Sequence, residues 1–291
     1  MGYAAVKKIA RSLGCYRQAV WFHRHLMDRG DLDQEKTDLA FFLNFVRKGD
    51  LVFDVGANYG SKSRVFLKLG ARVVAFEPVE DCVEEWEAAY GGDPSLTIVR
   101  SAVAPTSGER KFYVRPSRVF SGFLEHWAED VESEIVVPTV TLDQMIAKHG
   151  KPEYIKIDVE GYEDEVLKGL TQPVRYVSFE YHLTEDEVTK TLNCVQYLSG
   201  LGEIAVNIMP AEVGTFAYPG WLSKKAFFDI FPRDILAKDD YQYRYGDVFV
   251  ATTASPIEAV AGGRRSGVVS APSLDLFERR ATLSSLGPRN C

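Results

Sequence analysis

Four side chains that could take up a proton follow two apolar runs in the second half of the chain. Asp158 and Glu160 come directly after one run, and Glu180 and His182 follow the next. Imidazole has an ordinary pKa close to neutral pH, which makes His182 the best candidate for a general base. If its run is a strand, alternation places Glu180 on the same side, where a carboxylate could orient the ring. The pattern predicts proton removal from a nucleophile by His182 or by a neighbouring carboxylate.

The acidic residues have two other interpretations. Glu163, Asp164 and Glu165 continue the acidic run, and the dipole of a helix favours acids in its first turn. For these three residues we expect that structural role. The oxygen and nitrogen donors of the four residues named above could instead hold a metal ion. The sequence has no closely spaced ligand motif such as HExxH, so we predict no metal.

A second group of residues is typical of a nucleotide-binding turn. An apolar run leads into Asp54-Val-Gly56-Ala-Asn-Tyr-Gly60, where glycines let the backbone turn sharply and approach a ligand. Glu77 ends the next run, at the position from which an acid accepts hydrogen bonds from a ribose. The turn lacks the GxGxxG spacing that seats a pyrophosphate, and Asp54 would attract an ammonium or sulfonium group. These features favour an adenosyl cofactor with a cationic half over NAD. The alternative is an ordinary turn followed by a surface acid.

The elements that position these residues follow from a repeated pattern. Short apolar runs rich in β-branched residues alternate with helix-like stretches. Because the runs are apolar at consecutive positions, they are typical of strands covered on both faces. Helices between such strands predict βαβ units and an α/β fold with a parallel sheet. The expected strands are 51–55, 72–76, 96–99, 154–157, 174–179, 203–208 and 247–252, with extra strands at 111–115 and 134–137 in a polar insertion.

Both ends of the chain differ from this central part. Apolar spacing predicts helices over residues 4–27 and 34–46. We therefore predict an N-terminal helical extension (1–33) and a main domain (34–253). Residues 254–291, mostly Ala, Ser, Gly and Arg, offer little to bury and are expected to form a flexible tail.

Charge and composition narrow the class of protein. The net charge of −7 over 291 residues argues against nucleic-acid binding as the main activity. Residues 1–30 are basic, and we expect them to pack on the acidic body, with binding of an anionic acceptor or a neighbouring subunit as the alternatives. The four cysteines form no CxxC or Cys/His cluster, and no apolar stretch has the length of a signal peptide core or membrane span. We expect a soluble cytoplasmic protein with reduced thiols, either monomeric or a homo-oligomer.

The motifs together resemble the FkbM-type methyltransferases. The matching pieces, in the order of that family, are Asp54-Val-Gly-Ala-Asn-Tyr-Gly60, Ala75-Phe-Glu-Pro78, Val140-Thr-Leu-Asp143, Ile155-Lys-Ile-Asp-Val-Glu-Gly-Tyr-Glu163 and Phe179-Glu-Tyr-His182. The resemblance implies a doubly wound, Rossmann-like class I methyltransferase sheet of seven strands, the last one antiparallel. It also implies S-adenosylmethionine as methyl donor and, most often, a hydroxyl of a sugar, glycan or natural-product scaffold as acceptor.

The resemblance also implies roles for individual residues. The methionine half of the cofactor is expected at the turn, the ribose at Glu77 with Pro78, and the adenine beside Ser101 and Ala102. Asp158 is expected to reach the cofactor or the acceptor. The expected turn contacts are Asp54, Gly56, Ala57, Asn58, Tyr59 and Gly60. The identity of the acceptor is not assigned, because the segments expected to select it, the first 30 residues and those after about 210, lie outside the matching pieces. Transfer to nitrogen or carbon, or a non-catalytic binding subunit with this fold, are the alternatives.

Overall fold

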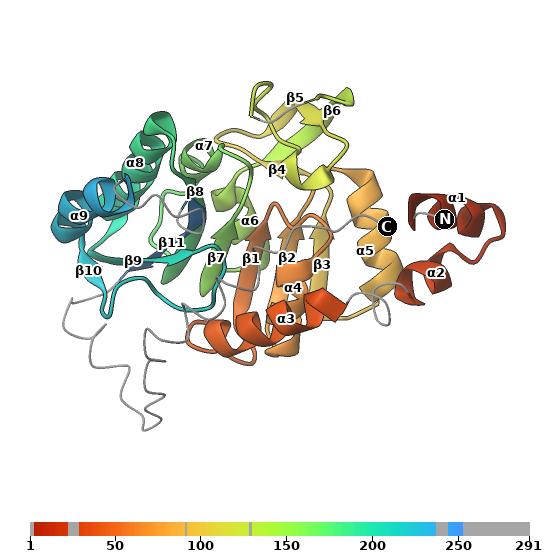
Figure 1. The fold of residues 1–291 in the computed structure, drawn as a ribbon, viewed down its shortest axis with the longest axis horizontal. Helices are drawn as coiled ribbons and strands as arrows, with labels where there is room; N and C mark the ends of the chain where they lie inside the picture. Colours follow the sequence, from red (N-terminus) through yellow and green to blue (C-terminus); the bar gives the residue numbers. More distant parts are fainter. Residues whose placement is uncertain (1–2, 23–28, 91, 128–129, 237–243, 253–291) are drawn as a thin grey trace, which may run out of the picture. The chain divides into compact units, whose positions relative to one another are not determined.

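The computed structural model describes residues 3–22, 29–90, 92–127, 130–236 and 244–252 (Figure 1). A central sheet has the strand order β10-β9-β11-β8-β7-β1-β2-β3. Strands β3, β2, β1, β7 and β8 pair in parallel, whereas β11 is antiparallel to both β8 and β9. The predicted doubly wound sheet with an antiparallel last strand is therefore confirmed, and the two-residue β10 adds an eighth strand. The strands are β1 (Leu51–Val55), β2 (Arg72–Phe76), β3 (Leu96–Val99), β7 (Tyr154–Ile157), β8 (Tyr176–His182), β9 (Ile204–Pro210), β10 (Leu222–Ser223) and β11 (Tyr245–Thr252).

Helices cover both faces of this sheet. Val52 and Phe53 are adjacent in β1 and belong to separate buried clusters, as alternation along a strand requires. One cluster joins the sheet to α3, α4 and α5, and the other joins it to α6, α7, α8 and α9. The helices are α3 (Arg29–Phe42), α4 (Ser61–Lys68), α5 (Glu80–Tyr90), α6 (Leu142–His149), α7 (Glu163–Leu167), α8 (Glu185–Leu201) and α9 (Lys224–Leu236).

The insertion between β3 and α6 forms a second, smaller sheet. Its strands are β4 (Ala102–Val103), β5 (Gly108–Val114) and β6 (Ser133–Val140), in the order β4-β6-β5, with β5 and β6 antiparallel. Both extra strands expected from the sequence are present and are longer than predicted. A short 3-10 helix (Arg118–Phe120) lies in the segment that connects β5 to β6.

The N-terminal extension differs from the prediction. The single helix expected over residues 4–27 is wrong, because the chain forms α1 (Tyr3–Ser12) and α2 (Tyr16–Phe22) with a break between them. Gly14 has a φ of 70°, and the Cys15 N–H donates to the Ala10 carbonyl across the end of α1. This left-handed glycine and its hydrogen bond are the features of a helix C-cap. Residues 23–28 and the expected flexible tail lie outside the described residues.

The basic extension contacts the acidic body. Helix α2 packs against α5, and the Arg11 guanidinium lies 2.7 Å from the Glu84 carboxylate of that helix. These contacts agree with the expected docking of the extension onto the body. The boundary at residue 33 stays a prediction.

The cysteines and the apolar character of the helices bear on the expectations from composition. Cys15, Cys82 and Cys194 are free thiols, and Cys291 lies outside the described residues. In the described part of the chain, no helix combines the length and apolar character that a bilayer span requires. The cytoplasmic location stays a prediction.

Candidate active site

The turn after β1 needs glycine at its start. Gly56 has a φ of 77°, and a Cβ added there would lie 1.8 Å from the Asp158 carbonyl oxygen. The Gly56 and Ala57 N–H groups both donate to the Phe76 carbonyl, at 3.1 and 3.0 Å, which joins the turn to the end of β2. The ends of β1, β2 and β7 therefore meet closely around one short segment of backbone.

Asp54 presents a buried carboxylate oxygen at this turn. Its side chain is 1% exposed and accepts a 2.5 Å hydrogen bond from Ser63 Oγ through Oδ2. The other oxygen, Oδ1, has no hydrogen-bond partner among the described residues. Burial raises the pKa of this carboxyl, an effect that Lys156 and Ser63 oppose. A cationic group beside Oδ1 would satisfy this buried acceptor.

Glu77 closes the other side of the turn. Its carboxylate accepts the Asn58 N–H and the Val79 N–H, each at 2.8 Å. Burial raises its pKa to about 7, although these two hydrogen bonds favour the charged form. Since a carboxylate offers about four lone-pair sites, two remain for other donors.

These residues line a cavity of about 330 Å³. Among the predicted cofactor residues, its walls include Asp54, Gly56, Ala57, Asn58, Tyr59, Glu77, Pro78, Ala102 and Asp158. Gly60 and Ser101 do not line it. Gly60, with a φ of 76°, packs instead against Trp86, and Ser101 is buried.

The sequence reasoning missed the charged part of the same cavity. Asp38 of α3 and Glu212 both pair with Lys62, at 2.7 and 3.0 Å, and all three residues line the wall. Arg118 and Phe123 of the insertion contribute another part of the lining. These residues are far apart in the sequence and belong to no motif, so only the fold brings them together.

Asp158 stands at the end of β7, as expected. The Lys156 ammonium lies 2.7 Å from Asp158 Oδ2, and Lys156 is buried. Nearby acids, Asp158 first among them, raise the lysine pKa and outweigh the opposing effect of burial. This ion pair compensates the charge of Asp158.

Glu160 is held in an unusual environment. Its backbone has a φ of 59°, and its Oε2 accepts a 2.6 Å hydrogen bond from the indole Nε1 of Trp127. Burial, followed by the charges of Glu180 and Asp158, raises its pKa to about 9. Trp127 comes from the insertion, and no sequence signal singled it out.

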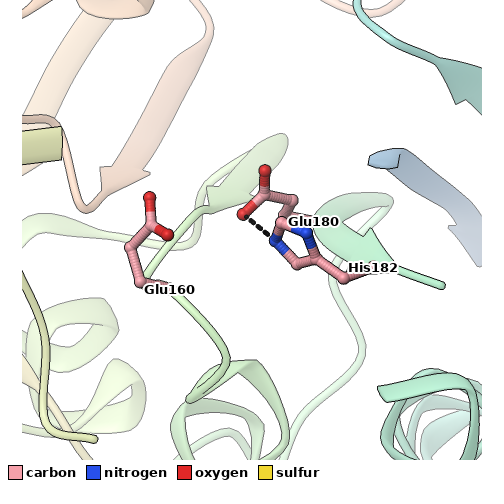
Figure 2. A group of neighbouring side chains, drawn as sticks. All are labelled: Glu160, Glu180 and His182. Atoms are coloured by element: carbon pink, nitrogen blue, oxygen red, sulfur yellow. Dashed lines mark ion pairs between the residues drawn. The ribbon is translucent and has the colours of Figure 1, made fainter. Parts of the chain in front are cut away.

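Glu180 and His182 face Glu160 from β8 (Figure 2). The prediction that they follow their strand is wrong, because they are among its last residues and pair with Asp247 and Tyr245 of β11. Glu180 Oε2 lies 3.0 Å from His182 Nε2. Burial and the neighbouring Asp158 raise the pKa of Glu180. The expected placement of both side chains on one side of the strand is correct.

The three side chains form one group, which we call the carboxyl–imidazole group: Glu160, Glu180 and His182. One donor atom from each lies within 4.8 Å of the others, a spacing that could also suit a cation. Glu163 is separate from this group, since its Oε1 accepts the Val159 and Gly161 N–H groups. With Asp164 and Glu165 it forms the first turn of α7, as the structural interpretation predicted.

The fold and the site define an α/β methyltransferase, with the glycine turn at the end of β1 and an antiparallel last strand. The FkbM methyltransferase domain matches residues 54–208. The chain belongs to this family, which confirms the resemblance inferred from the motifs, and it is a methyltransferase.

Three named methyltransferases are similar to this chain. The hexuronic acid methyltransferase AglP of Haloferax volcanii is 30% identical over 171 residues, which are 56% of this chain and 70% of that protein. An O-methyltransferase from Bacillus cereus aligns with a TM-score of 0.40 and 11% identity, covering 76% of this chain and 81% of the other. The C-terminal domain of precorrin-6Y C5,15-methyltransferase from Rhodobacter capsulatus aligns with a TM-score of 0.38 and 15% identity, covering 75% and 89%.

Proposed function

We propose that this chain transfers a methyl group from S-adenosylmethionine to a hydroxyl of a sugar or glycan. The observation that carries the proposal is the cavity in which Asp54, Glu77 and Asp158 converge around the glycine turn. It lies beside the carboxyl–imidazole group, because Glu160 belongs to both. One cavity thus brings a cofactor site next to side chains that can accept a proton.

The residues of the cavity suit this cofactor. Asp54 Oδ1, which no group of the described residues satisfies, suits a cationic methionine half, whereas it would repel the phosphates of NAD. The free lone pairs of Glu77 suit ribose hydroxyls. At Gly56, any side chain would collide with the Asp158 carbonyl, so only glycine lets the turn that lines the cavity lie against the end of β7. When bound, S-adenosylmethionine supplies an electrophilic methyl group.

We assign proton removal to the carboxyl–imidazole group. His182 Nε2 faces Glu180, which leaves Nδ1 as the ring nitrogen for the acceptor hydroxyl. Glu180 then orients the ring and stabilises the imidazolium that forms. Glu160, with its pKa raised to about 9, is a neutral acid near pH 7. Glu160 is the alternative base at higher pH.

A sugar acceptor is proposed from the similarity to the hexuronic acid methyltransferase. The test uses S-adenosylmethionine with a ¹³CD₃ methyl group and a panel of hexuronates, neutral sugars and amino sugars. Mass spectrometry and NMR of the products should place the label on a sugar oxygen. Label on nitrogen or carbon would reject the hydroxyl acceptor, and tighter binding of NAD than of S-adenosylmethionine would reject the cofactor.

A further inference from the structure

The segment between β5 and β6 is held in shape by one buried arginine. Arg115 is 1% exposed, and its guanidinium donates to the carbonyls of Phe120, Leu124 and Glu125 at 2.9–3.1 Å. Its own N–H donates to Ser121 Oγ at 3.0 Å. Hydrogen bonds from a buried charge are stronger than neutral ones, so the backbone of this segment is fixed up to two residues before Trp127.

From this segment Trp127 contacts two members of the carboxyl–imidazole group. Its indole N–H donates to Glu160 Oε2 at 2.6 Å, and its ring meets the His182 ring at a centroid distance of 4.9 Å and an angle of 76°. A Cβ added to Gly161 would lie 2.3 Å from the indole ring. Glycine at 161 therefore lets the ring lie against the backbone beside Glu160.

The charges around Glu160 make this hydrogen bond important. Glu180, Asp158 and Glu163 all raise the pKa of Glu160 by repulsion. Lys156 pairs with Asp158, and Lys190 of α8 lies 5.8 Å from the Trp127 ring centre. Among the described residues, the Trp127 indole is the side-chain donor that reaches the Glu160 carboxyl. This hydrogen bond holds the carboxyl in one position, and because it favours the charged form it opposes part of the rise in the Glu160 pKa.

We propose that Trp127 is a positioning residue for methyl transfer. Its indole N–H fixes the Glu160 carboxyl, and its ring holds the His182 imidazole in an edge-to-face contact. The insertion between β5 and β6 thereby sets the geometry of the proton-accepting side chains, although it belongs to a different sheet. This assignment rests on the proposed function of His182 and Glu160. Trp127 itself takes no part in making or breaking bonds.

The test compares Trp127→Phe with the wild type. Phenylalanine keeps an aromatic ring against Gly161 and His182 but has no N–H for Glu160. We expect kcat to fall tenfold or more, since small misplacements of catalytic groups are costly, with the KM for S-adenosylmethionine changed less than twofold. The pKa of the Glu160 carboxyl, followed by ¹³C NMR, should rise further above its wild-type value, because the lost donor favours the charged form.

The NMR titration needs no acceptor, so it tests Trp127 even if the proposed acceptor is wrong. Val136→Ala, at a residue of β6 that is 67% exposed, is the matched control and should leave kcat and the Glu160 titration unchanged. If Trp127→Phe folds and keeps the wild-type Glu160 titration, the positioning role is rejected. A wild-type kcat in that variant, measured on an established acceptor, would reject it as well.

Discussion

At the residue scale, two buried acids of the cavity differ in their hydrogen-bond partners. Glu77 already accepts two backbone hydrogen bonds, whereas Asp54 keeps one buried oxygen without a partner among the described residues. A ligand that donates hydrogen bonds at Glu77 and carries a positive charge near Asp54 would satisfy both. These two requirements restrict the identity of the ligand more than the glycine turn does, because many nucleotide sites share such a turn.

We expect Glu77→Ala to weaken S-adenosylmethionine binding at least tenfold. Hydrogen bonds to a charged acceptor are each worth about 1.5–3 kcal/mol. The variant also loses the contacts with the Asn58 and Val79 N–H groups, so Glu77→Gln should bind better than Glu77→Ala. Titration calorimetry measures the affinity, with Glu80→Ala, an exposed acid on the adjoining helix, as control. Wild-type affinity in a folded Glu77→Ala protein would disprove the ribose role.

His182→Ala should lower kcat about a hundredfold or more, with affinity for S-adenosylmethionine nearly unchanged, because general-base catalysis contributes typically 10²–10⁴-fold. The pH step that limits the wild-type rate at low pH should disappear in the variant. His149→Gln, at the last residue of α6, is the control. If the same pH step persists in His182→Ala, Glu160 becomes the candidate for the base. Activity that EDTA abolishes and Mg²⁺ restores would instead make the carboxyl–imidazole group a metal site.

At the scale of helices and strands, the sequence predicted the features that depend on local residue patterns. The parallel strands, the turn at Gly56 and the side shared by Glu180 and His182 follow from short-range periodicity. The break at Gly14 was missed because apolar spacing continues across it, and the spacing alone does not reveal a left-handed residue. Trp127, Lys62 and Glu212 were missed for another reason. Their roles arise from tertiary contacts across more than 20 residues of sequence, which no local pattern encodes.

The N-terminal helices offer a test at the same scale. Helix α3 lines the cavity through Gln34, Glu35 and Asp38. In contrast, α2 packs against α5, and α1 reaches α5 through the Arg11–Glu84 pair. A truncation that removes residues 1–22 should therefore leave a folded enzyme with an unchanged KM for the acceptor. Its melting temperature should fall, because the truncation removes the packing of α2 on α5, with its buried Val20, as well as the exposed Arg11–Glu84 pair. A tenfold rise in the acceptor KM would show instead that the basic extension binds the acceptor.

At the scale of the whole molecule, buried carboxyls should control how stability depends on pH. Burial raises the pKa of Glu77, Glu163 and Asp247 to about 7 and that of Glu160 to about 9. These values lie above those of an unfolded chain, so the folded state binds more protons between pH 4 and 9. The contribution of these groups to the free energy of unfolding should therefore be highest below about pH 4. It should fall as the pH rises through 7 and then 9.

Glu160→Gln isolates the contribution of one of these groups. The amide oxygen can still accept the Trp127 N–H, but the side chain no longer ionises. Between pH 7 and 9 the wild type should lose on the order of 2 kcal/mol more unfolding free energy than the variant, because Glu160 is ionised in the unfolded chain but still mostly protonated in the folded state. Urea denaturation of both proteins at pH 7, 8 and 9 measures the difference. Glu80→Gln, at an exposed acid, should behave as the wild type does. Equal losses in the wild type and Glu160→Gln would mean that Glu160 is already ionised at pH 7. Glu160 itself would then become the stronger candidate for the base.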